Sequence, residues 1–148
     1  VRYPRGGDGA FVDCAASPLL RAGKDITLVS YGKLINQVLA AAALLERQGI
    51  SAEVIKLPAV KPIDMSAIRA SVRKTGNLLV AEETVRIGCA GKEIAASLRA
   101  GGMNPRIRLC NVGDRFVPQG TINDLYRLLG LDAESLAKAA MEVLQREA

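Results

Sequence analysis

The sequence predicts an α/β fold: an open, doubly wound and mostly parallel sheet of about five strands with helices on both faces. Two observations carry this prediction. A short apolar run at 26–29 precedes a helical pattern and a second apolar run at 52–57, which together form a βαβ unit. A continuous apolar stretch at 78–81 is typical of a central parallel strand that is covered on both faces.

The first predicted helix follows the first strand. Its apolar residues recur at three- and four-residue spacing from Leu34 to Leu45, which places them on one face. Gly49 is expected to end this helix, because glycine adopts the left-handed conformation without penalty. Pro58 ends the second strand, since proline cannot donate to a sheet ladder. Because a helix connects the two strands, they should be parallel, with a right-handed crossover between them.

The middle of the chain continues the alternation of helices and strands. Asp64 is placed to cap a helix over 65–74, and Gly76 closes it. After the central strand, a third helix is predicted over 92–100. Polar and apolar residues then alternate at 106–109, which predicts a strand nearer to an edge of the sheet.

Two helices complete the chain. Thr121, with an acidic residue three positions on, forms a variant of the capping box at the start of a helix over 122–129. Asp132 is flanked by leucines at the spacing of a hydrophobic staple. It therefore predicts the start of a last helix that runs to about residue 146.

The chain is expected to divide into two parts. Residues 1–22 are rich in glycine and proline and predict an N-terminal arm or linker from a preceding domain, with a short extended piece near 10–12. Residues 23–148 predict the folded α/β domain. The chain opens within the motif RYPRG, so we expect it to be a fragment of a longer protein.

Composition excludes several classes of function. The sequence contains no histidine, so no Ser-His or Cys-His catalytic pair is available within it, and the commonest metal ligand is missing. Cys14, Cys89 and Cys110 are widely spaced, which suits neither a disulfide framework nor a zinc site and favours a reducing, cytoplasmic location. A scattered net charge of +5 and few aromatic residues argue against nucleic-acid binding, and no apolar run is long enough for a membrane span.

The carboxyl ends of the strands are where open α/β sheets bind ligands. Glu82 and Glu83 follow the central strand there. They could form an acid/base dyad, but consecutive strand residues point to opposite faces. The favoured interpretation is that one glutamate satisfies loop amides or contacts a neighbouring domain, while the other meets solvent.

Two further features could bind an anion. The turn from Gly88 to Gly91, followed by Lys92, could hold a phosphate at a helix N-terminus, although close packing of helix and sheet is favoured and Cys89 is expected to be a packed small residue. In the arm, Arg2 and Arg5 offer guanidinium groups suited to phosphate or carboxylate. From composition alone, the favoured interpretation is that these arginines lie in a solvated linker.

The motifs RYPRG, ITLVSYG, VKPID, NLLVAEE and NVGDRFVPQGT, taken together, resemble the C-terminal domain of the 1-deoxy-D-xylulose-5-phosphate synthase family. This family belongs to the transketolase-like enzymes that depend on thiamine diphosphate. The segment from ITLVSYG to VAEE is shared with the beta subunits of 2-oxo-acid dehydrogenase E1 components. RYPRG and FVPQGT favour the synthases.

The resemblance implies a function for the longer protein. Such enzymes decarboxylate pyruvate and condense the two-carbon fragment with D-glyceraldehyde 3-phosphate, in the biosynthesis of isoprenoid, thiamine and pyridoxal precursors. Thiamine diphosphate, Mg²⁺ and the catalytic residues are expected in the preceding domains, so this chain alone should hold no cofactor, metal or catalytic residue and be inactive. A cytoplasmic homodimer is expected.

The resemblance also implies roles for individual residues. Arg5, which matches the arginine of the family's Y-P-R-G motif, is expected to bind the phosphate of the acceptor aldehyde, and Arg2 is a weaker candidate for the same role. Glu82 and Glu83 are candidates for contact with another domain. The chain departs from the usual glycine-rich turn with Gly88-Cys-Ala-Gly, and it has Thr84 where asparagine is common.

Two alternatives stay open. The chain could be the C-terminal domain of an E1 beta subunit that acts as a docking module for an acyltransferase. It could also be a free-standing regulatory or nucleotide-binding domain, but this would need a phosphate loop after the first strand. The segment SYGKL does not provide one.

Overall fold

The structure, a computed structural model, describes residues 12–13 and 17–145. Its centre is a five-stranded sheet in which the strands lie in the order β1-β3-β2-β4-β5. The strands are β1 (Leu19–Arg21), β2 (Ile26–Ser30), β3 (Ala52–Lys56), β4 (Asn77–Ala81) and β5 (Arg106–Cys110). β1 pairs with β3 in antiparallel orientation, and the pairs β2/β3, β2/β4 and β4/β5 are parallel. The predicted open, mostly parallel sheet is confirmed.

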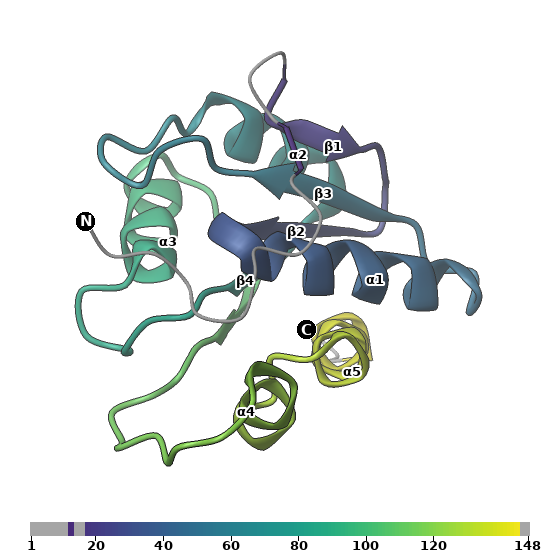
Figure 1. Ribbon diagram of the computed structural model, residues 1–148. Coiled ribbons are helices and arrows are strands. Elements are labelled where there is room, and N and C mark those ends of the chain that lie inside the picture. Colours follow the sequence, from purple (N-terminus) through teal and green to yellow (C-terminus); the bar gives the residue numbers. More distant parts are fainter. Residues whose placement is uncertain (1–11, 14–16, 146–148) are drawn as a thin grey trace.

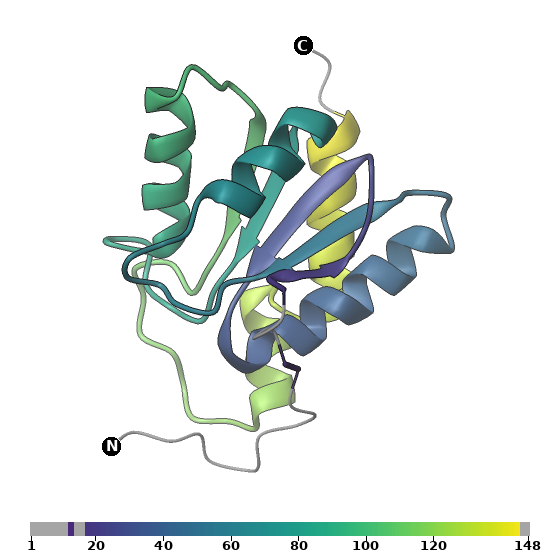
Figure 2. The same ribbon diagram turned by 90° about the horizontal axis from the view of Figure 1, so that it is seen from above.

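Helices cover both faces of this sheet (Figures 1 and 2). They are α1 (Ile35–Glu46), α2 (Ser66–Thr75), α3 (Ala90–Ala100), α4 (Ile122–Leu129) and α5 (Ala133–Gln145), and a short 3-10 turn, η1 (Gly32–Leu34), leads into α1. α1, α4 and α5 pack on one face, whereas α2 and α3 pack on the other. The sheet therefore separates two apolar cores, as the doubly wound prediction requires.

β2 lies at the centre of the sheet, and all five of its residues are buried. Ile26 and Leu28 belong to the core formed with α1 and α5, while Val29 belongs to the core formed with α2 and α3. Both faces of the strand are thus covered. This explains why the sequence shows a mostly apolar run there rather than a strict alternation.

The chain leaves the two central strands in opposite directions. After β2 it crosses through α1 to β3, and after β4 it crosses through α3 to β5 on the other side. The carboxyl ends of β2 and β4 therefore flank the topological switch point. In open α/β sheets this crevice is the usual place for a ligand.

The predicted helix ends are confirmed where side chains or glycine fix them locally. Gly76 ends α2 with a φ of 66°. Thr121 Oγ1 accepts a hydrogen bond from the Asp124 amide at 3.3 Å. Asp132 Oδ2 accepts one from the Ser135 amide at 3.3 Å. α4 spans the predicted residues, and α5 is described to residue 145.

Two helix starts differ from the prediction. α2 begins at Ser66, and Asp64 is not its N-cap, although Asp64 Oδ1 still accepts a hydrogen bond from the Ser66 amide at 2.9 Å. α3 begins at Ala90 rather than at residue 92. Its early start depends on the carboxylate of Glu82, which lies in another element and accepts hydrogen bonds from its first amides.

β1 lies within the segment 1–22, which the sequence analysis assigned to an arm without a strand at this position. Leu19 pairs with Ile55 and Arg21 with Val54 of β3. A strand of three residues directly after Pro18 is too short to show a periodic pattern, so its partner strand alone defines it. Most of the extended piece predicted near 10–12 lies outside the described residues, and the division of the chain at residue 22 stays a prediction.

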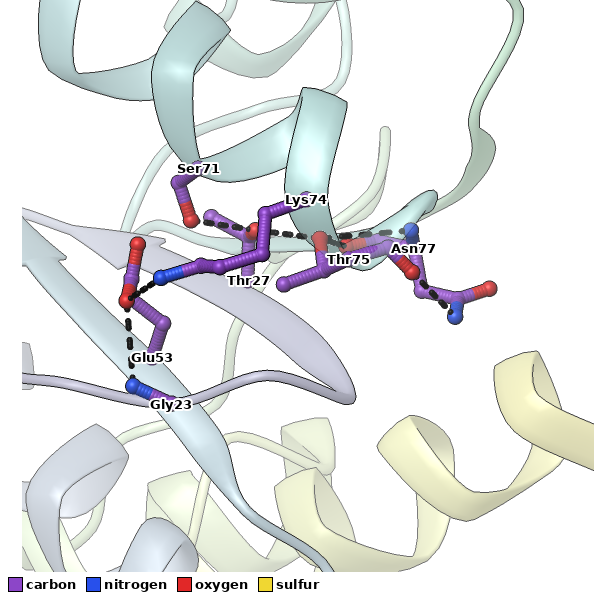
Figure 3. A network of polar contacts seen from close by, with 7 residues as sticks. All are labelled: Gly23, Thr27, Glu53, Ser71, Lys74, Thr75 and Asn77. Carbon is purple, nitrogen blue, oxygen red and sulfur yellow. Dashed lines mark hydrogen bonds and ion pairs between the residues drawn. The ribbon is translucent and has the colours of Figure 1, made fainter.

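A buried polar network ties α2 to the sheet (Figure 3). Thr27 of β2 has its Oγ1 2.7 Å from Ser71 Oγ and 2.8 Å from Thr75 Oγ1, both on α2. The Thr75 hydroxyl also lies 3.1 Å from the backbone carbonyl oxygen of Asn77, to which it can donate. Thr27 and Ser71 are 0% and 2% exposed, so water does not replace these partners.

Glu53 of β3 extends this network to the loop between β1 and β2. Its Oε2 accepts a hydrogen bond from the Gly23 amide at 3.0 Å and pairs with Lys74 Nζ. Burial by itself would raise the pKa of Glu53, but the hydrogen bonds from Lys74 and Gly23 outweigh it and lower the pKa below its ordinary value. A Cβ on Gly23 would lie 2.2 Å from the backbone carbon of Ala52, so this approach requires glycine.

Candidate functional site

Tyr31 and Glu82 meet across the topological switch point. Tyr31 directly follows β2, and Glu82 directly follows β4. The Tyr31 hydroxyl donates a hydrogen bond to Glu82 Oε2 at 3.1 Å. Side chains of the domain itself therefore bridge the crevice in which the fold would place a ligand.

Glu82 also occupies the N-terminus of α3. Its Oε2 accepts a hydrogen bond from the Ala90 amide at 3.0 Å, and its Oε1 accepts one from the Gly91 amide at 2.8 Å. The first amides of a helix have no partner within the helix, and they attract negative charge. Glu82 is 1% exposed, so a buried carboxylate fills the position that a phosphate could take at this helix end.

Gly91 allows the helix to come this close. A Cβ there would lie 2.7 Å from Glu82 Oε1, 2.8 Å from Leu109 Cδ2 and 3.3 Å from Val80 Cβ. Of the two interpretations of the turn from Gly88 to Gly91, the structure supports close packing of helix and sheet. The sequence analysis had favoured this interpretation over a phosphate site.

Cys89 precedes α3 and is 3% exposed. Burial raises the pKa of its thiol above the ordinary value, which opposes formation of a thiolate. Its sulfur lies 3.9 Å from Asn111 Nδ2. Burial likewise raises the pKa of Cys110. Cys89 thus packs as a small residue, as the sequence analysis expected.

Tyr31 acts as a hydrogen-bond donor at neutral pH. Burial, followed by the charge and the hydrogen bond of Glu82, raises its pKa to about 12. A phenol with this pKa keeps its proton across the physiological range. The Tyr31–Glu82 bond therefore holds β2 and β4 together at the crevice.

Glu83 lies on the opposite side from Glu82 and is exposed. Its Oε1 accepts a hydrogen bond from the Tyr126 hydroxyl at 2.8 Å, and Tyr126 belongs to α4. Burial and Glu83 together raise the pKa of Tyr126 above its ordinary value. The two glutamates thus take separate partners on the two faces of the sheet, which does not support an acid/base dyad.

A groove of about 720 Å³ opens beside the crevice. The loop after β3, the loop after β4 and the first turns of α3 line it. Its lining residues are Tyr31, Val60, Lys61, Pro62, Ile63, Met65, Thr84, Gly88, Cys89, Ala90, Glu93 and Ser97. In the described part of the chain, no group of three or more His, Cys, Asp or Glu residues could hold a metal ion. At this edge of the sheet, Glu82 holds α3 and Glu83 holds α4 through hydrogen bonds.

The structure places some of the predicted site residues and leaves others untested. Arg2, Arg5 and Cys14 lie outside the described residues. The two tyrosines that bind the glutamate pair were not predicted. Tyr31 could have been suspected from its place directly after a strand, but nothing in the sequence links Tyr126 to Glu83.

The fold and this edge of the sheet define a doubly wound α/β domain. At its switch point, the carboxylate of Glu82 binds Tyr31 and the first amides of α3. Comparison with known families gives a more specific assignment. The family model "Transketolase, C-terminal domain" matches residues 16–136. The chain therefore belongs to the transketolase C-terminal domain family.

The relatives of this chain include the expected synthases. It is 35% identical to a 1-deoxy-D-xylulose-5-phosphate synthase of Heliobacterium modesticaldum over 97% of this chain and 23% of that protein. It is also 36% identical to the pyruvate dehydrogenase E1 component subunit beta of Pisum sativum, over 85% of this chain and 35% of that protein. The resemblance to the synthase family is confirmed. The chain spans about a quarter of the length of the synthases it matches.

A solved structure of a split gene transketolase, described as an inactive beta4 tetramer, has a similar fold. It matches with a TM-score of 0.79 and 33% sequence identity, over 85% of this chain and 41% of that chain. The transketolase C-terminal fold is thus confirmed by an experimental structure. None of the helices in the described ranges has the length and apolar character needed to cross a membrane.

Proposed function

We propose that this chain is the C-terminal domain of a 1-deoxy-D-xylulose-5-phosphate synthase. The observation that carries the proposal is coverage: synthases from two organisms match 97% and 99% of the chain at 35% and 34% identity. The longer enzyme would condense pyruvate, with loss of CO₂, and D-glyceraldehyde 3-phosphate. Isoprenoid, thiamine and pyridoxal precursors would derive from the product.

Within that enzyme this domain would not hold the cofactor. The helix end best suited to a diphosphate, at the N-terminus of α3, is filled by the carboxylate of Glu82. The described residues therefore do not fit thiamine diphosphate at this position. We assign thiamine diphosphate and Mg²⁺ to the preceding domains, and this fragment alone is expected to be inactive.

The domain would contribute a substrate contact and packing surface. Arg5 would bind the phosphate of D-glyceraldehyde 3-phosphate, because a guanidinium group binds phosphate through two parallel hydrogen bonds. Arg2 is the weaker candidate for the same phosphate. Glu82 uses both carboxylate oxygens within the domain, so a contact of the glutamate pair with another domain is proposed for the exposed Glu83. The proposal includes a cytoplasmic homodimer.

The proposal is tested on the parent polypeptide. An antibody against this fragment should capture from cell extract a single long chain that turns over pyruvate with D-glyceraldehyde 3-phosphate. A shorter subunit accompanied by an alpha chain and an acyltransferase would instead support the second candidate, an E1 beta subunit. The match to the pea E1 subunit is the observation that keeps this candidate open.

The role of Arg5 has its own test in the parent enzyme. Arg5→Ala should lower kcat/KM for D-glyceraldehyde 3-phosphate by about 10- to 100-fold, as expected when a charged hydrogen bond to phosphate is lost. Arg5→Lys should restore part of the activity, and the KM for pyruvate should stay close to its original value. An unchanged kcat/KM in Arg5→Ala would rule out the phosphate contact.

A further inference from the structure

Two loops expose apolar side chains at the carboxyl edge of the sheet. Val85 and Ile87, in the loop after β4, are 49% and 72% exposed. Phe116 and Val117, in the loop after β5, are 101% and 39% exposed. We call these four residues the loop patch. A fully exposed phenyl ring has no apolar partner among the described residues, and burying it would be favourable.

Hydrogen bonds and an ion pair hold the two loops side by side. The Val112 amide donates to the Thr84 carbonyl oxygen at 3.0 Å. The Arg86 guanidinium donates through Nε and Nη2 to Asp114 Oδ2, both at 3.3 Å. Figure 1 shows both loops leaving the sheet on the same side, between β4 and α3 and between β5 and α4. The loop patch therefore stands on two loops that are joined to each other beside the sheet.

This arrangement resembles an interface rather than an ordinary surface. Apolar residues scattered singly on a surface need no explanation, but several exposed on joined loops beside polar groups are typical of a contact site. The surface ion pair adds little stability, and the backbone hydrogen bond from Val112 to Thr84 joins the same two loops. The four apolar side chains are thereby presented together.

We propose that the loop patch is the surface through which this domain contacts the preceding part of its own longer chain. This inference rests on the proposed function, in which the domain is the last part of a synthase. The occupant would be an apolar surface with a recess for the ring of Phe116 and polar groups opposite Arg86 and Asp114.

The size of the loop patch favours an occupant in the same chain over a separate molecule. Four side chains of this kind cover a few hundred Å², less than the ~800 Å² per partner of a typical stable complex between separate proteins. A tethered domain needs less area, because its effective concentration is on the order of mM. The related synthase of Heliobacterium modesticaldum is long enough for such an occupant, since this chain covers 23% of it.

Hydroxyl-radical footprinting of the purified parent chain tests the inference. Phe116 should be oxidised several-fold more slowly in the folded parent than in the denatured parent. Leu128, which is 56% exposed on α4 and outside the loop patch, should react at similar rates in both states. Oxidation of Phe116 as fast in the folded as in the denatured parent would overturn the proposal. Protection that disappears on dilution would also overturn it, because the occupant would then be a second copy.

A pair of variants of the parent chain gives a second readout. Ile87→Asp with Phe116→Asp should separate the thermal unfolding of this domain from that of the rest of the chain and expose the junction to protease. Leu128→Asp places the same charge on an exposed apolar position outside the loop patch and should leave one joint transition.

The outcomes distinguish the two proposals. If the wild-type parent lacks turnover but protects Phe116, the proposed function fails and the contact surface stands. If the wild-type parent turns over the substrates, but the double variant unfolds in one joint transition as Leu128→Asp does, only the contact surface fails.

Discussion

The Gly91 amide nitrogen lies 2.8 Å from Glu82 Oε1, and a methyl carbon at Gly91 would lie 2.7 Å from the same oxygen. The hydrogen bond and the absence of a side chain are thus two parts of one arrangement. The carboxylate satisfies the helix end only because the helix backbone can approach it closely. The helix end that could bind an anion therefore binds Glu82 instead, and this contact attaches α3 to the end of β4.

Gly91→Ala should destabilise the domain. Its Cβ would also lie 2.8 Å from Leu109 Cδ2, so either α3 or the buried side chains must move. We expect a loss of about 1–3 kcal/mol in the free energy of unfolding, as for other overpacked sites. Urea denaturation measures this loss.

Gly101→Ala is the matched control for that measurement. A Cβ at Gly101 would have its nearest neighbour, the backbone oxygen of Ser97, at 3.4 Å. Its effect should be small. Equal losses in the two variants would show that the close approach of α3 to Glu82 is not what requires Gly91.

Removing the charge of Glu82 should make Tyr31 easier to ionise. Glu82→Gln keeps the shape of the side chain but removes the negative charge that helps to raise the pKa of Tyr31 to about 12. The pKa should fall, although burial, which is the largest cause, should still hold it above 10.0. The phenolate absorbance reports this titration, and comparison with Tyr31→Phe assigns it.

Glu93→Gln provides the same change of side chain at an exposed position of α3 that also lines the groove. It should leave the Tyr31 titration as in the wild type. A Tyr31 titration that is unaltered by Glu82→Gln would contradict the hydrogen bond across the switch point.

The stability of the domain should decrease at alkaline pH through Tyr31. Folding raises the pKa of Tyr31 from 10.0 to about 12, so the folded state holds the phenolic proton more tightly. Its contribution is fully present below pH 10 and is lost as the pH rises toward 12. Tyr31→Phe cannot ionise, so the wild type should lose stability relative to this variant in that window. A constant difference between the two proteins would refute the prediction.

Local signals explain why much of the fold could be predicted. The apolar periodicity of α1, the left-handed Gly76 and the cap at Thr121 each depend on residues within one or two turns. The apolar run of β4 reveals a strand covered on both faces without reference to its neighbours. The order of the strands was not predicted, because right-handed crossovers fix the face on which each helix lies and not which strands are neighbours.

What the sequence did not reveal depends on partners far apart in the chain. β1 is defined by its pairing with β3, and the start of α3 is defined by Glu82. For the glutamate pair, the sequence analysis proposed loop amides or a neighbouring domain as the partner of one member, and the structure shows amides of α3. It could not identify Tyr31 and Tyr126 as partners, because these lie 51 and 43 residues away from the carboxylates they contact.

Acid should destabilise the domain partly through Glu53. The pKa of Glu53 is lower in the folded state than its ordinary value of 4.5, because hydrogen bonds from Lys74 and the Gly23 amide outweigh the opposing effect of burial. Its contribution to stability is present above pH 4.5 and is lost as the pH falls through the lowered pKa. Glu53→Gln should therefore show a smaller further loss below pH 4.5 than the wild type, measured by urea denaturation at each pH.

Lys74→Met provides the opposite test of Glu53. Burial is the largest single influence on this carboxyl, and without the ammonium group fewer hydrogen bonds oppose it, so the pKa of Glu53 should rise. Arg86→Met, which removes the cation from the exposed ion pair with Asp114, controls for the change in net charge. If Lys74→Met and Arg86→Met had the same acid profile, the ion pair between Lys74 and Glu53 would not govern the titration of Glu53.

Thr27→Val should weaken the attachment of α2 to β2. Valine keeps the branched shape of threonine but leaves Ser71 Oγ and Thr75 Oγ1 without the partner they have 2.7 and 2.8 Å away. We expect a loss of about 1–3 kcal/mol in the free energy of unfolding, the usual net contribution of two hydrogen bonds.

Thr27→Ser keeps the hydroxyl and should retain more stability than Thr27→Val, although it removes a methyl group. A double-mutant cycle with Ser71→Ala then separates the hydrogen bond from the packing. If the two hydroxyls act as a unit, the double variant should lose less than the sum of the two single losses. Strict additivity would mean that the hydroxyls do not depend on each other.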